Sequence, residues 1–525
     1  MTTNHESTNR ESTNRESTNR ESTNRESTNR ESTNRESTNR DTTAAELEVV
    51  LAAAHAARRE LAATGPDVRA DRLVAVADAL DAEGEELVAL AGAETHLATA
   101  RLTGELRRTT FQARLFADAL RSGAVTPVRI DHADPDWGTG PRPDLRRTVT
   151  PVGPVLVFAA SNFPFAFSAF GGDTVSASAA GCPVVVKAHP GHPRLSRRTA
   201  DVVNGALRRA GAPEGTFALV EGVEASLVAL RDDRIAAAAF TGSLRGGRAL
   251  FDIAAARPVP IPFYGELGSV NPVVVTPAAW EQRGAEIASG WVGSLTLGAG
   301  QFCTNPGVVL VPDAEAFLAA VELPVPAPML HTGIASAFHD AVRTLSDVPG
   351  VSAALAGEPS EEGVRAQVLR TTAASVLAHP SILEVEAFGP AGLVVEYTSP
   401  EELAAVLDTI PGQLTGTVQA ATGSVDPVAA SAVVVLAERV GRVVYNDWPT
   451  GVTVSGAQHH GGPYPATTAP LTTSVGLEAI ARFQRPVAFQ SVPQELLPAE
   501  LRDRATGADA VGGPLESVRP AGVVG

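Results

Sequence analysis

Short apolar segments alternate with helical stretches from residue 152 onward, and this alternation limits the chain to few folds. The first apolar runs are 155–158, 184–187, 217–220 and 235–240. Strands separated by helical stretches predict a parallel sheet of the Rossmann type, because a parallel crossover needs a long connection. A second set of candidate strands, 273–275, 308–311, 392–395 and 443–445, predicts a second α/β lobe. Ligands of such open sheets bind at the carboxyl ends of the strands.

The remaining segments predict a helical region, an extended arm and two tails. Between 46 and 122 apolar residues recur at three- and four-residue spacing, which is typical of helices that bury one face. Residues 127–147 predict an extended hairpin arm. Seven tandem copies of Glu-Ser-Thr-Asn-Arg occupy 6–40 and contain no apolar side chain, so we expect disorder there. We expect a second loose tail over 505–525.

Charge and cysteine content exclude several classes of function. The formal net charge is -17, which argues against a nucleic-acid partner because phosphate binding requires a basic face. No apolar run approaches the roughly 18 residues of a bilayer span. The two cysteines form no disulfide framework and the N-terminus lacks a secretory signal pattern. We therefore expect a cytoplasmic protein with no membrane segment and no metal site.

A single lysine, Lys187, remains in a chain whose other Lys or Arg positions are all arginine. This bias marks Lys187 as a position that requires a compact ammonium group. The residue ends a predicted strand, at the ligand-binding edge of the sheet. The turn Thr241-Gly242-Ser243 follows another strand and leads through Gly247 into a helix, which suits a pyrophosphate, although ordinary turn geometry is the alternative. Together the two features predict a nucleotide site.

Cys303 lies in a loop of small and polar residues, Gly298-Ala-Gly-Gln-Phe-Cys-Thr-Asn-Pro306, between a predicted helix and a predicted strand. Small neighbours allow a substrate and a cofactor to approach the sulfur, so a thiolate there is a candidate nucleophile. The alternative is a buried thiol that acts as a small hydrophobe. Cys182, in Ala-Gly-Cys-Pro before a strand, fits that second interpretation.

Two polar residues near the predicted strands are further candidates. Glu266 joins the two α/β regions, where a carboxylate is either a general base or an ordinary surface charge. Asn162 comes straight after a strand, where its amide can stabilise an oxyanion or cap the next helix. The residues alone leave both alternatives open.

These residues, in this order, resemble the aldehyde dehydrogenase superfamily over roughly residues 46–498. The resemblance implies an α/β fold that follows a repeat tail (1–45). Its parts are a Rossmann-type cofactor domain (46–126 and 148–266), an α/β catalytic domain (267–465) and a small β oligomerisation arm (127–147 and 483–498). It also implies a homodimer or homotetramer. The stretches 187–193, 298–306, 446–451 and 460–467 are most similar to the branch that contains 2-oxoglutarate semialdehyde dehydrogenases and related NADP-linked enzymes.

The resemblance assigns a role to each candidate. Cys303 is the implied nucleophile, Glu266 the general base and Asn162 the oxyanion-hole amide. The residues implied to contact the cofactor are Ala160, Ser161, Lys187, Pro190, Gly242, Ser243, Gly247, Glu386 and Phe388. Arg108, Phe163 and Phe170 are implied to contact the substrate. Because many NAD-preferring relatives carry a glutamate where Pro190 stands, we expect NADP as the cofactor, with NAD as the alternative.

The implied reaction is oxidation of an aldehyde to a carboxylic acid through a thioester on Cys303, with 2-oxoglutarate semialdehyde as the expected substrate. Arg108 is the expected partner of the substrate carboxylate. Two alternatives stay open: a general NADP-dependent aldehyde dehydrogenase for uncharged aldehydes, and a catalytically silent binding relative. A CoA-acylating enzyme is disfavoured, because Glu266 would waste its thioester by hydrolysis.

Overall fold

A computed structural model describes residues 40–360 and 364–503. The predictions of a disordered repeat over 6–39 and of a loose tail over 505–525 lie outside the described residues. The first described helix, α2 (Ala44–Ala63), begins two residues before the predicted helical region. Thr43 explains this start, since its hydroxyl accepts a hydrogen bond from the Glu46 backbone while the Glu46 carboxylate accepts one from the Thr43 backbone.

The first lobe is built on a five-stranded parallel sheet with the order β5-β4-β3-β6-β7. Its strands are β3 (Val155–Phe158), β4 (Val184–Lys187), β5 (Phe217–Val220), β6 (Ala237–Thr241) and β7 (Phe263–Glu266). The chain moves outward from β3 through β4 to β5 and then returns to the other side of β3, so the strand order reverses between β3 and β6. Lys187, Thr241 and Glu266 all end strands at the same edge. Ligands of open α/β sheets bind at such a reversal point.

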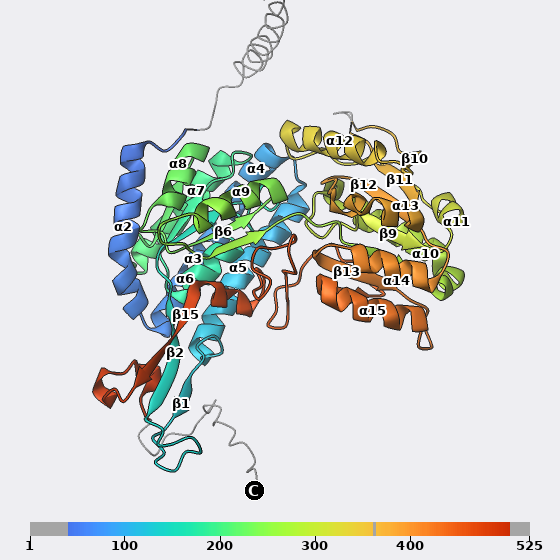
Figure 1. Ribbon diagram of the computed structural model, residues 1–525. Helices are drawn as coiled ribbons and strands as arrows, with labels where there is room; N and C mark the ends of the chain where they lie inside the picture. The colour runs from blue at the N-terminus through green and yellow to red at the C-terminus, as the bar shows by residue number, and fades with distance from the viewer. Residues whose placement is uncertain (1–39, 361–363, 504–525) are drawn as a thin grey trace, which may run out of the picture. The chain divides into compact units, whose positions relative to one another are not determined.

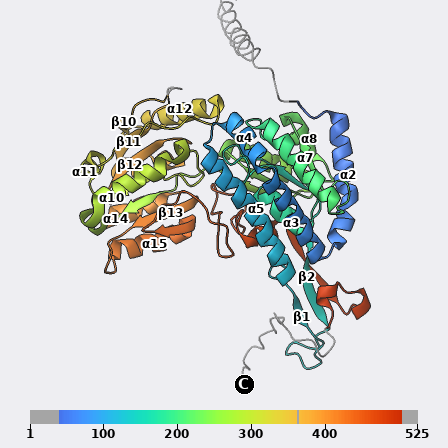
Figure 2. The same ribbon diagram turned by 180° about the vertical axis from the view of Figure 1, so that it is seen from behind.

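Helices cover both faces of this sheet, which explains why its strands are largely apolar before their carboxyl ends. One face packs against α2, α8 (Val223–Arg231) and α9 (Leu244–Ala255) (Figure 1). The other packs against α3 (Pro66–Ala82), α4 (Gly84–Thr95), α5 (Thr99–Ser122), α6 (Gly172–Ala180) and α7 (Pro193–Arg209) (Figure 2). In β3, Val155 and Val157 enter the second core and Leu156 and Phe158 the first.

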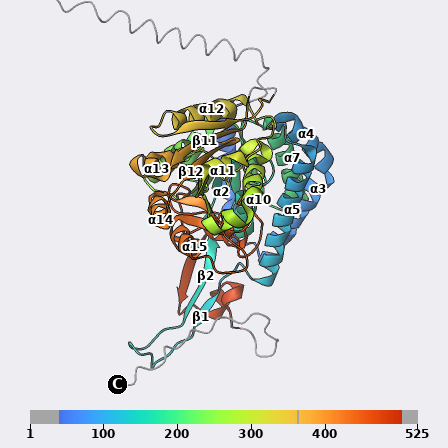
Figure 3. The ribbon, with the colours of Figure 1, turned by 90° about the vertical axis from the view of Figure 1, so that its right-hand side faces the viewer.

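The second lobe is built on a seven-stranded sheet, order β10-β11-β12-β9-β8-β13-β14, in which only β10 is antiparallel. Its strands are β8 (Val273–Val275), β9 (Val308–Val311), β10 (Ser352–Ala356), β11 (Gln367–Thr372), β12 (Ala391–Glu396), β13 (Gln413–Gln419) and β14 (Val440–Tyr445). Helices α10 (Pro277–Thr296) and α11 (Ala314–Ala319) cover one face. The other carries α12 (Thr332–Ser346), α13 (Ala373–Ala378), α14 (Pro400–Thr409) and α15 (Pro427–Arg439) (Figure 3).

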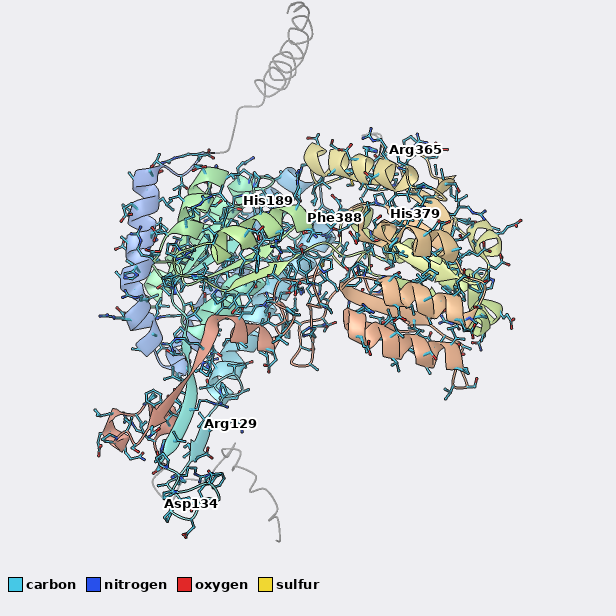
Figure 4. All side chains as sticks on the ribbon, in the orientation of Figure 1. Arg129, Asp134, His189, Arg365, His379 and Phe388 are labelled. Carbon is cyan, nitrogen blue, oxygen red and sulfur yellow. The ribbon has the colours of Figure 1, made fainter. Side chains whose placement is uncertain are left out.

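A three-stranded antiparallel sheet forms the arm predicted around residues 127–147. It contains β1 (Arg129–Asp131), β2 (Leu145–Pro151) and, from near the other end of the chain, β15 (Gln484–Gln490). Arg129 and Asp134 lie on this arm (Figure 4). Short 3₁₀ segments are η1 (Leu297–Gly300), η2 (Pro380–Glu384), η3 (Leu477–Phe483), η4 (Gln494–Leu496) and η5 (Ala499–Leu501). No helix within 40–360 and 364–503 is long and apolar enough to cross a bilayer.

Candidate active site

The loop that carries Cys303 begins with a tight turn of left-handed backbone. Gly298, Ala299 and Gly300 have consecutive φ angles of 57°, 57° and 69°. Holding the Ala299 side chain in that region costs about 1–3 kcal/mol, which the surrounding packing must offset. Position 300 accepts only glycine, because a Cβ there would lie 2.2 Å from the carbonyl oxygen of Gly389.

Two buried asparagines hold this loop. Asn271 Nδ2 donates to the carbonyl oxygens of Cys303 at 2.8 Å and of Asn305 at 2.9 Å. Asn305 Nδ2 donates in turn to the carbonyl oxygens of Gly300 at 2.6 Å and Gly389 at 3.2 Å. Each such bond contributes about 0.5–1.5 kcal/mol net. Together these bonds fix the backbone from which the cysteine side chain projects.

The sulfur of Cys303 has a histidine neighbour. His460 Nε2 lies 3.5 Å from Cys303 Sγ. Burial raises the pKa of the Cys303 thiol to about 12, and the charges of Glu266 and Glu386 act in the same direction while two arginines oppose them. Burial lowers the pKa of His460 to about 3. A neutral thiol therefore faces a neutral imidazole within hydrogen-bonding distance.

Asn162 and Phe163 lie against the cysteine loop. Asn162 Nδ2 donates to the carbonyl oxygen of Gln301 at 3.1 Å, and its own carbonyl oxygen accepts from Arg101 at 2.7 Å. The Phe163 ring meets the Phe302 ring edge to face at 5.3 Å. The Arg101 guanidinium lies over both rings, at 5.2 Å and 4.8 Å from their centroids. The structure thus brings two predicted site residues to the loop of the predicted nucleophile.

Glu266 ends β7 and is only 3% exposed, which excludes the interpretation as a surface charge. Its Oε1 accepts a hydrogen bond from Arg482 Nη2 at 2.7 Å. Its Oε2 is buried and has no hydrogen-bond partner within the described part of the chain. Burial raises the pKa of Glu266 to about 7, Arg482 opposes this rise and Asp173 adds to it. A carboxylate with such a pKa is suited to general base catalysis near neutral pH.

Two largely buried arginines, Arg108 and Arg442, act on the same thiol. Arg108 lies on α5, stacks over Phe167 at 5.3 Å and donates to the Val452 carbonyl at 3.3 Å. Arg442 lies on β14 and donates to two loop carbonyls. Arg108 Nη1 and Arg442 Nε are buried and lack partners in the described chain. Neither arginine forms an ion pair with a described residue, although the charge of Glu105 acts on Arg108 and that of Asp447 acts on Arg442 from farther away.

The predicted nucleotide residues of the first lobe lie along the carboxyl edge of its sheet. Lys187 is partly buried, which lowers the pKa of its ammonium group. Ser243 begins α9, and its hydroxyl accepts from the Gly246 backbone at 3.2 Å. Gly247 allows the helix to approach Leu267, since a Cβ there would lie 2.1 Å from the leucine side chain. The start of α9 is thereby held at the sheet edge, where its free amides can receive a phosphate.

The second lobe contributes Glu386 and Phe388, which line one pocket together with Ser269. Burial raises the pKa of Glu386 to about 7, and the Ser269 backbone opposes this rise. A Cβ at Gly268 would lie 2.7 Å from Glu386 Oε2, so this glycine leaves the room that the carboxylate occupies. Phe388 lies on the side of the second lobe toward His189 of the first (Figure 4).

Ala160, Ser161 and Pro190 also lie at the sheet edge. The Ala160 carbonyl accepts from His192 Nε2 at 3.0 Å, which ties β3 to the turn before α7. Pro190 is exposed and offers neither charge nor donor to a ligand. His189, beside it, lies 6.1 Å ring to ring from His331 of the second lobe. The predicted cofactor residues of the first lobe therefore lie along the carboxyl edge of its sheet, and position 190 contributes no carboxylate there.

One predicted substrate residue does not reach the site. Phe170 is 3% exposed, belongs to the core of the first lobe and shares a small cavity with Cys182. The chain turns back at Gly171, where a Cβ would meet backbone atoms at 2.5 Å, and this turn directs Phe170 inward. This position gives no support to the prediction that Phe170 lines the substrate channel.

The sequence did not predict three residues at the site: His460, Arg442 and Arg482. His460 begins a stretch that supported the resemblance, but nothing in the spacing links it to Cys303. The two arginines carry no signal of their own in a chain that uses arginine as its general cation.

Fold and site together define a two-lobed α/β enzyme with a cysteine beside the carboxyl edge of a Rossmann-type sheet. The model of the aldehyde dehydrogenase family matches residues 17–322, and the chain belongs to this family of oxidoreductases that act on aldehydes.

The chain is similar to named relatives over most of its length. It is 45% identical over 448 residues to alpha-ketoglutaric semialdehyde dehydrogenase 2 of Azospirillum brasilense, covering 83% of this chain and 85% of that protein. It is 40% identical over 467 residues to alpha-ketoglutaric semialdehyde dehydrogenase of Acinetobacter baylyi, covering 87% and 89%. A solved NAD-dependent aldehyde dehydrogenase from Sinorhizobium meliloti aligns with a TM-score of 0.70 at 24% identity, over 86% of this chain and 88% of that one. This last likeness confirms the predicted fold.

Proposed function

We propose that the protein oxidises 2-oxoglutarate semialdehyde to 2-oxoglutarate, with NAD(P)⁺ as the oxidant. The observation that carries the substrate is the pair of largely buried arginines, Arg108 and Arg442, that act on the thiol of Cys303 and each keep a buried nitrogen without a partner among the described residues. A buried guanidinium nitrogen without a hydrogen-bond partner is costly, and the carboxylate of an anionic substrate can supply that partner. The two relatives named as alpha-ketoglutaric semialdehyde dehydrogenases support the same substrate.

Cys303 is the proposed nucleophile. Its sulfur forms a bond to the aldehyde carbon after the thiol proton passes to His460 Nε2, 3.5 Å away. The aldehyde oxygen becomes an oxyanion, for which the Asn162 amide and the Cys303 backbone N–H are the proposed donors. The bound nucleotide supplies the hydride acceptor, so that the adduct on Cys303 is left as a thioester.

Glu266 is the proposed base for hydrolysis. It takes a proton from a water molecule, whose oxygen attacks the thioester carbon and displaces the sulfur of Cys303. The products are the carboxylic acid and the restored cysteine. The buried, unpartnered Oε2 of Glu266 supports this role, because it is an acceptor that no described protein group uses.

The residues present fit a dinucleotide. Lys187, Gly242, Ser243 and Gly247 at the edge of the first sheet, with Ala160 and Ser161, are the proposed ligands of the adenosine and pyrophosphate parts. Glu386, which Gly268 accommodates, and Phe388 are proposed to hold the nicotinamide ribose and ring. Pro190 places no carboxylate where it would repel a 2′-phosphate, so we propose that NADP is accepted at least as well as NAD.

The arm sheet supports a proposal of a homodimer or homotetramer. Its outer strands β1 and β15 each pair with β2 on one side only, which leaves their other edges available for pairing with a second copy. Light scattering coupled to size-exclusion chromatography determines the number of subunits.

Steady-state kinetics on a panel of aldehydes with both nucleotides test the proposed function. We expect 2-oxoglutarate semialdehyde to give the highest kcat/KM, with 2-oxoglutarate as the product. A preference for uncharged aldehydes of similar length would favour a general aldehyde dehydrogenase instead. Binding of nucleotide without turnover of any aldehyde would favour a catalytically silent relative.

A further inference from the structure

Arg482 lies fully buried between two carboxylates that come from distant parts of the chain. Its Nη2 donates to Glu266 Oε1 at 2.7 Å, and its Nη1 donates to Asp173 Oδ1 at 3.3 Å. Its Nε donates to the Thr472 hydroxyl at 3.1 Å, and its guanidinium faces the Tyr264 ring at 5.5 Å. The strand β7, the helix α6 and the segment η3 thus meet at one cation.

We propose that Arg482 is a positioning residue for the general base. It holds one oxygen of Glu266 and keeps the carboxylate ionised, while Asp173 offsets part of the charge of Arg482. This inference rests on the proposed role of Glu266 in hydrolysis of the thioester.

The two oxygens of Glu266 have different environments, which supports this role. Oε1 is held by Arg482, whereas Oε2 is buried and has no partner among the described residues. If the ion pair only stabilised the fold, we would expect both oxygens of Glu266 to have hydrogen-bond partners, since an unpaired buried acceptor costs about 1–3 kcal/mol. The arrangement instead fixes the carboxylate and leaves one oxygen free to receive a proton from water.

The charges around Glu266 predict how substitution of Arg482 or Asp173 changes the pH dependence of hydrolysis. The titratable and charged neighbours from the packed elements are Arg482 of η3, Asp173 of α6, Tyr264 of β7, Cys303 of its loop, and His459 and His460 beside Arg482. Burial lowers the pKa of both histidines and raises that of the thiol, so these three groups are neutral near pH 7. Burial raises the pKa of Asp173 and Arg482 opposes that rise, so Arg482 and its partner Asp173 set the charge next to the base.

The expected shifts have opposite signs. Hydrolysis needs ionised Glu266, so its rate falls as the pH falls through the pKa of this carboxyl. Loss of the Arg482 charge raises that pKa and moves the acidic limb of the rate profile to higher pH. Loss of the Asp173 charge lowers the pKa and moves the limb to lower pH.

The test is the pH profile of single-turnover hydrolysis of the acyl-enzyme in R482Q, R482K and D173N. We expect R482Q to move the acidic limb upward by about one pH unit and to slow hydrolysis at pH 7 about fivefold or more, with the acylation burst retained. R482K should return the limb toward its wild-type position, and D173N should move it downward. If R482Q does not fold, the profile of D173N alone tests the proposal. An acidic limb of D173N at the wild-type position would then overturn it.

The matched control is R257Q. Arg257 is also buried, but it donates to the carbonyls of Leu230, Asp232 and Ile235 in the first lobe and takes no part in the site. R257Q should lower thermal stability and leave the limb in place. If the acidic limb of R482Q lies at the same pH as that of R257Q and of the wild type, Arg482 only stabilises the fold.

A separate experiment on Glu266 distinguishes failure of the proposed function from failure of the role of Arg482. If E266Q hydrolyses the thioester at the wild-type rate, Glu266 is not the base and the proposed function is wrong. If E266Q blocks hydrolysis but R482Q does not shift the limb, the function stands and only the role of Arg482 falls.

Discussion

His460 Nε2 lies 3.5 Å from Cys303 Sγ across 157 residues of sequence. Burial raises the pKa of the thiol to about 12 and lowers that of the imidazole to about 3, so the two groups rest as a neutral pair. Both shifts oppose formation of a thiolate–imidazolium pair. Arg108 and Arg442 lower the pKa of both groups, so their charge favours the thiolate and disfavours protonation of the imidazole.

Replacement of His460 by asparagine tests this relationship. We expect H460N to slow both alkylation of Cys303 by iodoacetamide and the acylation step about tenfold or more, because the acceptor of the thiol proton is lost. The alkylation rate should rise with pH beyond 9 in both proteins, since the raised pKa keeps the thiolate scarce at neutral pH. Stopped-flow measurement of the burst and labelling kinetics provide the readouts.

The adjacent histidine is the control for this prediction. H459N alters a partly buried imidazole that has no contact with the sulfur, so it should leave alkylation unchanged. Equal effects of H459N and H460N would exclude a specific role for His460.

The two cysteines should respond differently to alanine. C303A is expected to abolish aldehyde oxidation while nucleotide binding persists, because only the nucleophile is removed. C182A should change turnover little, since Cys182 is buried, burial raises the pKa of its thiol to about 11, and its sulfur donates to the Phe483 carbonyl in the core of the first lobe. Turnover and nucleotide fluorescence measure both effects. An active C303A variant would refute the assignment.

Cofactor choice should respond to position 190. P190E places a carboxylate beside the proposed ribose site, where it repels a 2′-phosphate but can bind a free ribose hydroxyl. We expect kcat/KM with NADP to fall about tenfold or more while that with NAD stays within a few-fold of wild type. A wild-type enzyme that uses NAD and ignores NADP would contradict the cofactor proposal.

Substrate charge should be recognised by Arg108 and Arg442. R108A and R442A should each raise KM for 2-oxoglutarate semialdehyde about tenfold or more, because a charge-assisted bond contributes roughly 1.5–3 kcal/mol. An uncharged aldehyde of similar length should be affected much less. R107A, on the same helix but exposed, is the control and should change neither substrate. If R108A and R442A raised KM equally for both aldehydes, the arginines would contribute to packing and not to recognition of the substrate carboxylate.

Apolar strands of the two parallel sheets could be predicted from the sequence, whereas polar strands could not. Strands β3, β4, β5 and β9 have the predicted bounds because apolar runs buried on both faces leave a clear pattern. The strand β13 (Gln413–Gln419) was missed because its buried residues are largely polar. Their hydrogen bonds run to distant positions, as from Thr415 to Asn271, and no local pattern reports them.

The same limit applies to the site. Asn162 and Cys303 stand in motifs with unusual local composition, and the structure brings Asn162 to the cysteine loop. His460, Arg442 and Arg482 come from the part of the chain after β13, and long-range packing alone brings them to the thiol and the base. Phe170 lies in the core of the first lobe, and its nearness to Asn162 in the sequence does not report the turn at Gly171.

The most direct test of the account is mass spectrometry of the E266Q variant mixed with 2-oxoglutarate semialdehyde and NADP⁺. With the base removed, the acyl-enzyme should accumulate, and the peptide that contains Cys303 should gain the mass of the 2-oxoglutaryl group as one equivalent of NADPH forms. The peptide that contains Cys182 should stay unmodified. Formation of NADPH with Cys303 unmodified at every time point, or an adduct on Cys182 instead, would contradict the account.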